Sequence, residues 1–270
     1  MNRVNAPDGT PLVYDAYEPP ASESGPRTAV LLLHGWADQA ERWAARGASL
    51  RDAGFAAYVL DQRGHGRSGG RRAHLSRFSQ LLGDLQAFRR AVRRHHDVPQ
   101  VLFGHGFGGL VVLRYLETQP GEPPIAAIVS SPWLASRRRP AAWKRLAAKF
   151  ADLWPTLPTG RGDDRMTAGA RAEIQWAQRA VVADHQRIEC PLLFLLAGND
   201  QVVDASLART FAEALTCQAR VRWYPELGHE SVRQPDDAGE PVMRDMLEFL
   251  AGPHYFGSRW KVETRAPSDS

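Results

Sequence analysis

The segment from Gln100 to Gln119 constrains the fold of this chain more than any other. A short apolar run, Gln100–Phe103, is followed by the glycine-rich sequence Gly104–Gly109 and then by the apolar stretch Leu110–Gln119. The first run predicts a buried strand, the glycines predict a tight turn, and the longer run predicts a helix. The glycines also allow the backbones of strand and helix to approach closely. The segment therefore predicts a strand–turn–helix unit of an α/β fold.

The rest of the chain repeats this alternation of short apolar strands and amphipathic helices. The pattern predicts a mostly parallel sheet covered by helices on both faces. We expect eight strands, with residues 1–131 and 188–251 forming the core and the polar segment 252–270 lying outside it. The strands that can be located are Leu12–Tyr17, Ala29–Leu33, Ala56–Leu60, Gln100–Phe103, Ile125–Val129, Leu192–Ala197 and Val221–Tyr224, and the helices are Glu41–Ala53, Phe78–His96, Leu110–Gln119, Ala205–Leu215 and Val242–Leu250.

The alternation is interrupted once, between Pro132 and Arg187. These roughly 55 residues have helical patterning and no strand, although a direct crossover needs only about a dozen. We expect residues 132–187 to form a helical cap over the carboxyl ends of the strands, where sheets of this kind bind ligands. An apolar helix face in the cap either packs on the core or forms an acyl-binding lid that touches membrane surfaces transiently. The cap residues expected to contact a substrate are Trp133, Trp143, Phe150 and Trp154.

Composition argues against several classes of function. The net charge of +4 is small for 270 residues, and the arginines are dispersed without interleaved aromatic residues, so we expect no nucleic-acid partner. Cys190 and Cys217 show no metal-ligand spacing and no disulfide framework. The first residues contain no signal-peptide core, and no run approaches the ~18 apolar residues of a membrane span. We therefore expect a cytoplasmic protein, while its oligomeric state stays unknown.

Two loops supply the side chains of an acid–base pair. Asp200 and His229 each follow a predicted strand. In hydrolases with a strand–turn–helix bend, the chain order is nucleophile, acid, histidine, which here corresponds to Gly106, Asp200 and His229. Asp200 would fix the tautomer of His229, whose other ring nitrogen would act as general base. Asp204 is a competing acid, but it is better placed to cap the next helix.

Gly106 stands where this chemistry requires a nucleophile. The turn of such hydrolases reads Gly-x-Ser-x-Gly, with the serine at the bend. Glycine has no side-chain atom that attacks a carbonyl carbon, so no acyl-enzyme can form at this position. The expected oxyanion-hole donors are the backbone N–H groups of Trp36, after the turn His34-Gly35, and of Phe107. Both donors are main-chain groups and are independent of a serine.

Two further motifs carry a family resemblance. The sequences Leu33–Trp43 (LHGWADQAERW) and Asp61–Gly70 (DQRGHGRSGG) resemble the monoacylglycerol lipase and lysophospholipase branch of the α/β-hydrolases. The resemblance covers nearly the whole folded chain and implies an α/β-hydrolase fold with hydrolysis of a single acyl ester. It implies no metal and no organic cofactor. The Arg63–Gly70 loop would then be structural and lie near the entrance of the active site.

The departure at Gly106 leaves two interpretations. In the first, the chain is a carboxylic-ester hydrolase with little or no turnover, because Gly106 is an isolated loss or a knock-out. In the second, it is a natural pseudo-hydrolase that binds a lipid-like ligand or a protein partner. A cap that is shorter than in relatives between Trp154 and Trp176 favours the second, whereas the retained acid–base pair favours the first. Ser130 or Ser131 as a replacement nucleophile, and non-hydrolytic chemistry based on His229, are weaker alternatives.

Overall fold

The structure is a computed structural model that describes residues 2–20, 28–118, 123–137, 155–156, 166–233, 239–252 and 264–265. Its strands form one sheet in the order β1-β2-β4-β3-β5-β6-β7-β8-β9. The strands are β1 Asn2–Asn5, β2 Pro11–Tyr17, β3 Ala29–Leu33, β4 Ala56–Asp61, β5 Gln100–His105, β6 Ala126–Ser130, β7 Leu192–Ala197, β8 Ala219–Tyr224 and β9 Thr264–Arg265. The helices are η1 Ala40–Trp43, α1 Ala44–Asp52, α2 Phe78–His95, α3 Phe107–Thr118, α5 Ala168–Asp184, η3 His185–Arg187, α6 Ala205–Ala214, η4 His229–Val232 and α7 Glu240–Ala251.

The mostly parallel sheet predicted from the alternation is confirmed. Only β2 pairs antiparallel, with β1 on one side and β4 on the other, and the remaining strand pairs are parallel. The predicted eight strands correspond to β1–β8, although the sequence had not located β1. The two-residue strand β9 extends the sheet beside β8 and comes from the segment 252–270, which was expected to lie outside the core.

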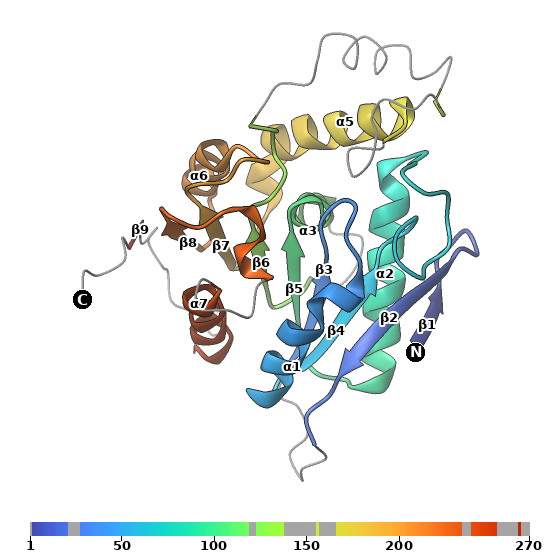
Figure 1. The fold of residues 1–270 in the computed structure, drawn as a ribbon, viewed down its shortest axis with the longest axis horizontal. Coiled ribbons are helices and arrows are strands. Elements are labelled where there is room, and N and C mark those ends of the chain that lie inside the picture. The colour runs from blue at the N-terminus through green and yellow to red at the C-terminus, as the bar shows by residue number, and fades with distance from the viewer. Residues whose placement is uncertain are drawn as a thin grey trace.

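Helices cover both faces of the sheet (Figure 1). The inner strands are continuous apolar runs because parallel strands under two helical layers are buried on both sides. In β3, all five residues are buried. Leu31 and Leu33 pack into the cluster shared with α2, α3 and α6, while Val30 and Leu32 pack into the opposite cluster with α1 and α7. Alternate residues of this strand therefore pack against opposite helical layers.

The loop Arg63–Gly70 is held by ion pairs, of which the one between Arg63 and Asp84 is buried. Arg63 donates from Nε and Nη2 to the two carboxylate oxygens of Asp84 on α2, at 2.8 and 2.6 Å, and from Nη1 to Asp8 at 2.6 Å. The side chains of Arg63 and Asp84 are only 9% and 3% exposed. Arg67 donates to Asp61 at the end of β4. These contacts attach the loop to the sheet, in agreement with the structural role expected for it.

The parallel strands β3–β8 end at the same edge of the sheet, and helix α5 lies beyond that edge (Figure 1). Helix α5 belongs to the segment 132–187 expected to form the cap, and it packs against α3. Of the four cap residues expected to contact a substrate, Trp133 is described, whereas Trp143, Phe150 and Trp154 lie outside the described residues. Within the described ranges, no helix has the length and apolar character that crossing a membrane requires.

Candidate active site

The chain reverses direction at Gly106, between the last residue of β5 and the first residue of α3. Gly106 has a φ of +53°, in the left-handed region that glycine adopts without the cost other residues meet. Its N–H donates to the carbonyl of Ser130 at 2.9 Å, and its carbonyl accepts from Trp133 N–H at 2.9 Å. Helix α3 begins at Phe107, three residues before the predicted start at Leu110. A single residue, Gly106, therefore joins the strand to the helix.

Two neighbouring glycines permit this bend because other backbone comes too close for a side chain. A Cβ at Gly104 would collide with the carbonyl of Gly108, and a Cβ at Gly108 would collide with the carbonyls of Leu33 and His34. The Gly108 N–H donates to the His34 carbonyl at 3.1 Å. The first turn of α3 is thus bonded directly to the turn that follows β3.

Asp200 and His229 lie together beside this bend. The Nδ1 of His229 is 2.7 Å from Oδ2 of Asp200, whose side chain is fully buried. Oδ1 of Asp200 accepts from the backbone N–H groups of Val202 at 2.8 Å and Val203 at 2.9 Å. Burial alone raises the pKa of Asp200, but the hydrogen bonds from His229 and these amides outweigh it and hold the pKa below its usual value. The carboxylate is therefore ionised at neutral pH, and Nδ1 of His229 carries the proton that it donates.

The second nitrogen of His229 faces position 106. A Cβ placed on Gly106 would lie 3.2 Å from His229 Nε2, and its next neighbours would be Cε1 of His229 at 3.6 Å and Cα of Gly35 at 3.8 Å. Because Nδ1 is the protonated nitrogen, Nε2 presents a lone pair there. The structure thus brings the three positions Gly106, Asp200 and His229 together in the arrangement of a triad without its hydroxyl.

The expected oxyanion donors belong to the two bonded turns. Phe107 opens α3, so its N–H has no partner within the helix, and no acceptor for it or for the N–H of Trp36 occurs among the described residues. The rings of Trp36 and Phe107 pack edge to face with centroids 5.1 Å apart. The positive end of the α3 dipole adds to the attraction for a developing negative charge.

His34 fixes the turn that carries Trp36. Its ring is fully buried, its Nε2 accepts from the Gln62 N–H at 3.1 Å, and its carbonyl accepts from Gln62 Nε2 at 2.6 Å. Burial lowers the pKa of His34, so the ring stays neutral at pH 7. His34 is therefore a structural residue, and its neutral ring places no charge next to the expected oxyanion donors.

Asp204, the competing acid, caps a helix. Its Oδ1 accepts from the Leu207 N–H at 3.0 Å at the start of α6, which confirms the predicted N-cap. Ser130 and Ser131 are 3% and 1% exposed. With His229 they are among the residues that line a cavity of about 10 Å³. Asp200, and not Asp204, is therefore the acid that contacts His229.

Sequence reasoning missed His105, whose position next to Gly106 was the only signal for it. Its buried ring packs against that of His229 with centroids 4.6 Å apart, and its Nε2 has no partner within the described part of the chain. Ligand atoms of His105, His229 and Glu230 lie within 4.8 Å of one another, a spacing that a metal ion could bridge. However, His229 Nδ1 is bonded to Asp200, and Glu230 is paired with Arg233.

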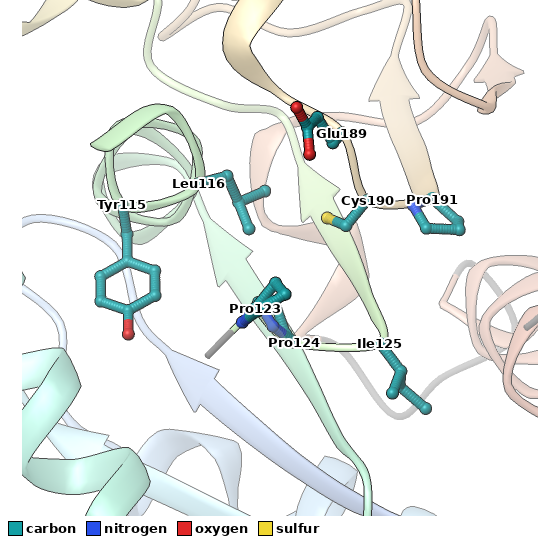
Figure 2. A pocket seen from close by; sticks show the side chains of 8 residues that line it. All are labelled: Tyr115, Leu116, Pro123, Pro124, Ile125, Glu189, Cys190 and Pro191. Carbon is teal, nitrogen blue, oxygen red and sulfur yellow. The ribbon is translucent and has the colours of Figure 1, made fainter. Parts of the chain in front are cut away.

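One cavity lies near the bend, and another lies far from it. One of about 370 Å³ lies between α5 and the loop after β6, and its lining includes Trp133, Met166, Ile174 and Gln178. Trp133 connects this cavity to the bend, because its N–H donates to the carbonyl of Gly106 and its ring centroid lies 6.5 Å from that of Phe107. A second cavity, of about 270 Å³, lies at the amino ends of β6 and β7, the opposite end of these strands from the bend (Figure 2). Only the first is placed to receive a substrate of this site.

Comparisons with known proteins agree with this geometry. A family model described as serine aminopeptidase, S33, matches residues 24–167 and 161–236. The monoacylglycerol lipase of Mycolicibacterium smegmatis is 28% identical over 268 residues, covering 90% of this chain and 93% of that protein. The crystal structure of the Paleococcus ferrophilus monoacylglycerol lipase is similar at a TM-score of 0.75 and 26% identity, over 88% of this chain and 98% of that one. A soluble variant of the Saccharomyces cerevisiae monoglyceride lipase, solved with a substrate analogue, has a TM-score of 0.82 at 17% identity, over 94% and 95% of the two chains. The predicted α/β-hydrolase fold is confirmed.

Proposed function

The chain belongs to the serine aminopeptidase S33 family, and from this premise we propose that it binds acyl esters as a carboxylic-ester hydrolase-like protein with little or no turnover. One observation carries the proposal. His229 Nε2 lies 3.2 Å from the place of a Cβ on Gly106, with Asp200 hydrogen-bonded behind it. The base is thus in position, while glycine supplies nothing for it to activate.

The proposed ligand is a single acyl ester with a lipid-like chain, such as a monoacylglycerol. Its carbonyl oxygen would accept from the N–H groups of Trp36 and Phe107, and one arm would enter the cavity lined by Trp133, Met166 and Ile174. The similarity to proteins named monoacylglycerol lipase supports this substrate class. We also propose a cytoplasmic location, transient contact of the cap with membrane surfaces, and contact of the cap residues Trp143, Phe150 and Trp154 with the substrate. No metal or organic cofactor is needed for these roles.

Low turnover follows from the chemistry of position 106. Removing the nucleophile of a serine hydrolase costs about 10⁶ in turnover, while the oxyanion hole and binding retain roughly 10³–10⁴ over the reaction in water. In the proposed site, Trp36 and Phe107 supply the oxyanion donors, His229 supplies the base and Asp200 supplies the acid. We therefore expect binding of the ester to be kept and its hydrolysis to be slow.

A second candidate function is binding without any turnover, to a lipid-like ligand or a protein partner. The observation that favours it is the φ of +53° at Gly106. A serine held in such a conformation stores on the order of 1–3 kcal/mol of strain, which glycine relieves. In a pseudo-hydrolase, glycine in place of serine at position 106 would stabilise the fold without removing a group that its function requires.

Restoring the hydroxyl tests the proposal. The chain and its Gly106→Ser variant would be assayed with a medium-chain nitrophenyl ester and a monoacylglycerol, and labelled with a fluorophosphonate that reacts with activated serines. We expect an unlabelled, nearly inert parent and a labelled variant that is faster by several orders of magnitude. Gly106→Ser combined with His229→Gln is the matched control and should stay unlabelled. Strong labelling of the parent would reveal another nucleophile, with Ser130 and Ser131 as the first to map. A folded but inert Gly106→Ser variant would favour the second candidate.

A further inference from the structure

We propose that His229 activates a water molecule in the place of the missing serine side chain, so that this chain hydrolyses esters slowly in one step, without an acyl-enzyme. The inference rests on the proposed function, because it uses the same ester site. It differs from serine catalysis in the attacking atom and in the absence of a covalent intermediate.

The first support is the space at the bend. The three atoms nearest to a Cβ on Gly106 would lie at 3.2, 3.6 and 3.8 Å, so a methyl group there would be tight against His229 Nε2 and in ordinary contact with the other two atoms. Glycine fills none of this space, and it also lacks the hydroxyl that would extend beyond it. A water molecule at this position, 3.2 Å from Nε2, would donate a hydrogen bond to the lone pair of His229. General-base catalysis requires contact of this kind, at about 2.6–3.2 Å.

The second support is the protonation state of the histidine. The ionised Asp200 accepts the Nδ1 proton of His229 at 2.7 Å, so the free base position is Nε2. The ring stacked against it belongs to His105, whose pKa is held well below its usual value by burial and by the charges of His229 and Arg233. His105 therefore stays neutral while His229 takes up a proton. Asp200 stabilises the imidazolium that forms.

The proposed reaction balances with water as the only co-reactant. The water oxygen bonds to the ester carbonyl carbon while one water proton moves to His229 Nε2. The carbonyl π electrons move to oxygen, where the N–H groups of Trp36 and Phe107 stabilise the charge. The bond from carbon to the alcohol oxygen then breaks, and that oxygen takes the proton from Nε2. The products are the alcohol and a carboxylic acid, which ionises in water.

The Gly106→Ala variant distinguishes hydrolysis by a water that His229 activates from hydrolysis accelerated by the oxyanion hole alone. Neither glycine nor alanine supplies a nucleophile, so the two differ only in space and in backbone strain. The alanine methyl would sit 3.2 Å from His229 Nε2, where the attacking water is proposed to lie. Gly54→Ala is the control for strain, because Gly54 has a φ of +87° and a Cβ there would meet nothing within 4 Å.

The experiment measures hydrolysis of the medium-chain nitrophenyl ester after treatment with the fluorophosphonate, which silences contaminating serine hydrolases. General-base catalysis contributes about 10²–10⁴ in rate, so Gly106→Ala and His229→Gln should each lose at least about 10²-fold. Gly54→Ala should keep the parent rate. Mass spectrometry of the quenched reaction should find no acylated parent but an acylated Gly106→Ser variant. Circular dichroism confirms that each variant is folded, and His229→Gln provides the test if Gly106→Ala does not fold.

Four results would overturn the inference: equal rates for the parent and folded Gly106→Ala, a parent rate no higher than that of buffer, an acylated parent, or loss of parent activity in EDTA. The last would assign the water to a metal ion at His105, His229 and Glu230. In each case an active Gly106→Ser variant would leave the proposed function standing. An inert, unlabelled Gly106→Ser variant would instead count against the proposed function itself.

Discussion

Replacing Asp200 with asparagine should reduce kcat/KM of the Gly106→Ser variant by about 10⁴-fold. The reason is the environment of the two carboxylate oxygens. Oδ1 accepts from the N–H groups of Val202 and Val203 at 2.8 and 2.9 Å, whereas Oδ2 faces His229 Nδ1 at 2.7 Å. An asparagine keeps its carbonyl oxygen on the two backbone donors and therefore presents its NH₂ group to His229. The imidazole must then accept at Nδ1 and carry its proton on Nε2, so it cannot take one from the serine.

The magnitude follows from these contacts. Flipping the amide would turn NH₂ toward two backbone donors, and each unsatisfied buried N–H costs about 1–3 kcal/mol. The state in which His229 carries its proton on Nε2 is therefore lower in free energy than the state with a flipped amide. The same exchange in the triad of a serine protease lowers kcat by about 10⁴, which corresponds to roughly 5.5 kcal/mol in the activation barrier at 1.36 kcal/mol per tenfold.

The assay compares kcat/KM for the nitrophenyl ester in the Gly106→Ser background with and without Asp200→Asn. Asp204→Asn is the matched control: asparagine is an equally good N-cap, so we expect less than a threefold change. Nitrogen NMR of the His229 ring in the parent gives a readout that needs no activity and should show the proton moving from Nδ1 to Nε2. A loss smaller than tenfold, an unchanged tautomer, or a larger effect of Asp204→Asn would refute the reasoning.

Two further predictions concern stability, each measured by urea unfolding. Arg63→Met should destabilise the fold by about 3–5 kcal/mol, because it leaves the Asp84 carboxylate, 3% exposed, without its cation. Adding Asp84→Leu should recover most of this loss, and an Arg63→Met effect below about 1 kcal/mol would contradict the argument. Burial raises the pKa of Glu117 from 4.5 to about 7 against the opposing hydrogen bond from Arg114. The folded state therefore holds this proton more tightly than the unfolded state, and stability should fall by up to about 3 kcal/mol as pH rises from about 4.5 to 7. Glu117→Gln should remove that part of the pH dependence, whereas an unchanged slope would show that Glu117 is ionised throughout.

The start of α3 shows where sequence reasoning failed. Leu110 was expected to begin the helix because Gly108 and Gly109 have low helix propensity. In the structure the helix begins at Phe107, since Gly108 packs on the backbone of Leu33 and His34 with no room for a side chain. Tertiary packing overrode propensity at this point. The result matters for function, because it makes the Phe107 N–H the first donor of the helix.

Strand β1 and His105 were missed for a related reason. Asn2–Asn5 contains only one apolar residue, and it forms a strand because it pairs with β2 at the edge of the sheet. His105 is an ordinary residue in the sequence, and only the fold stacks it against His229. Both features depend on partners that are distant along the chain, so no local pattern indicates them.

The sequence alone determined the alternation of strands and helices, the order of Gly106, Asp200 and His229, and the absence of a hydroxyl at the bend. These properties depend only on which residues are present and on their local spacing, so they do not require knowledge of contacts with distant segments. Only the tertiary structure decided that His229 Nε2 faces Gly106, that two backbone amides orient Asp200, and that Asp204 serves α6 instead. Such relations are set by packing among segments far apart in the chain, because hydrogen bonds and contacts depend on distance in space and not on position in the sequence.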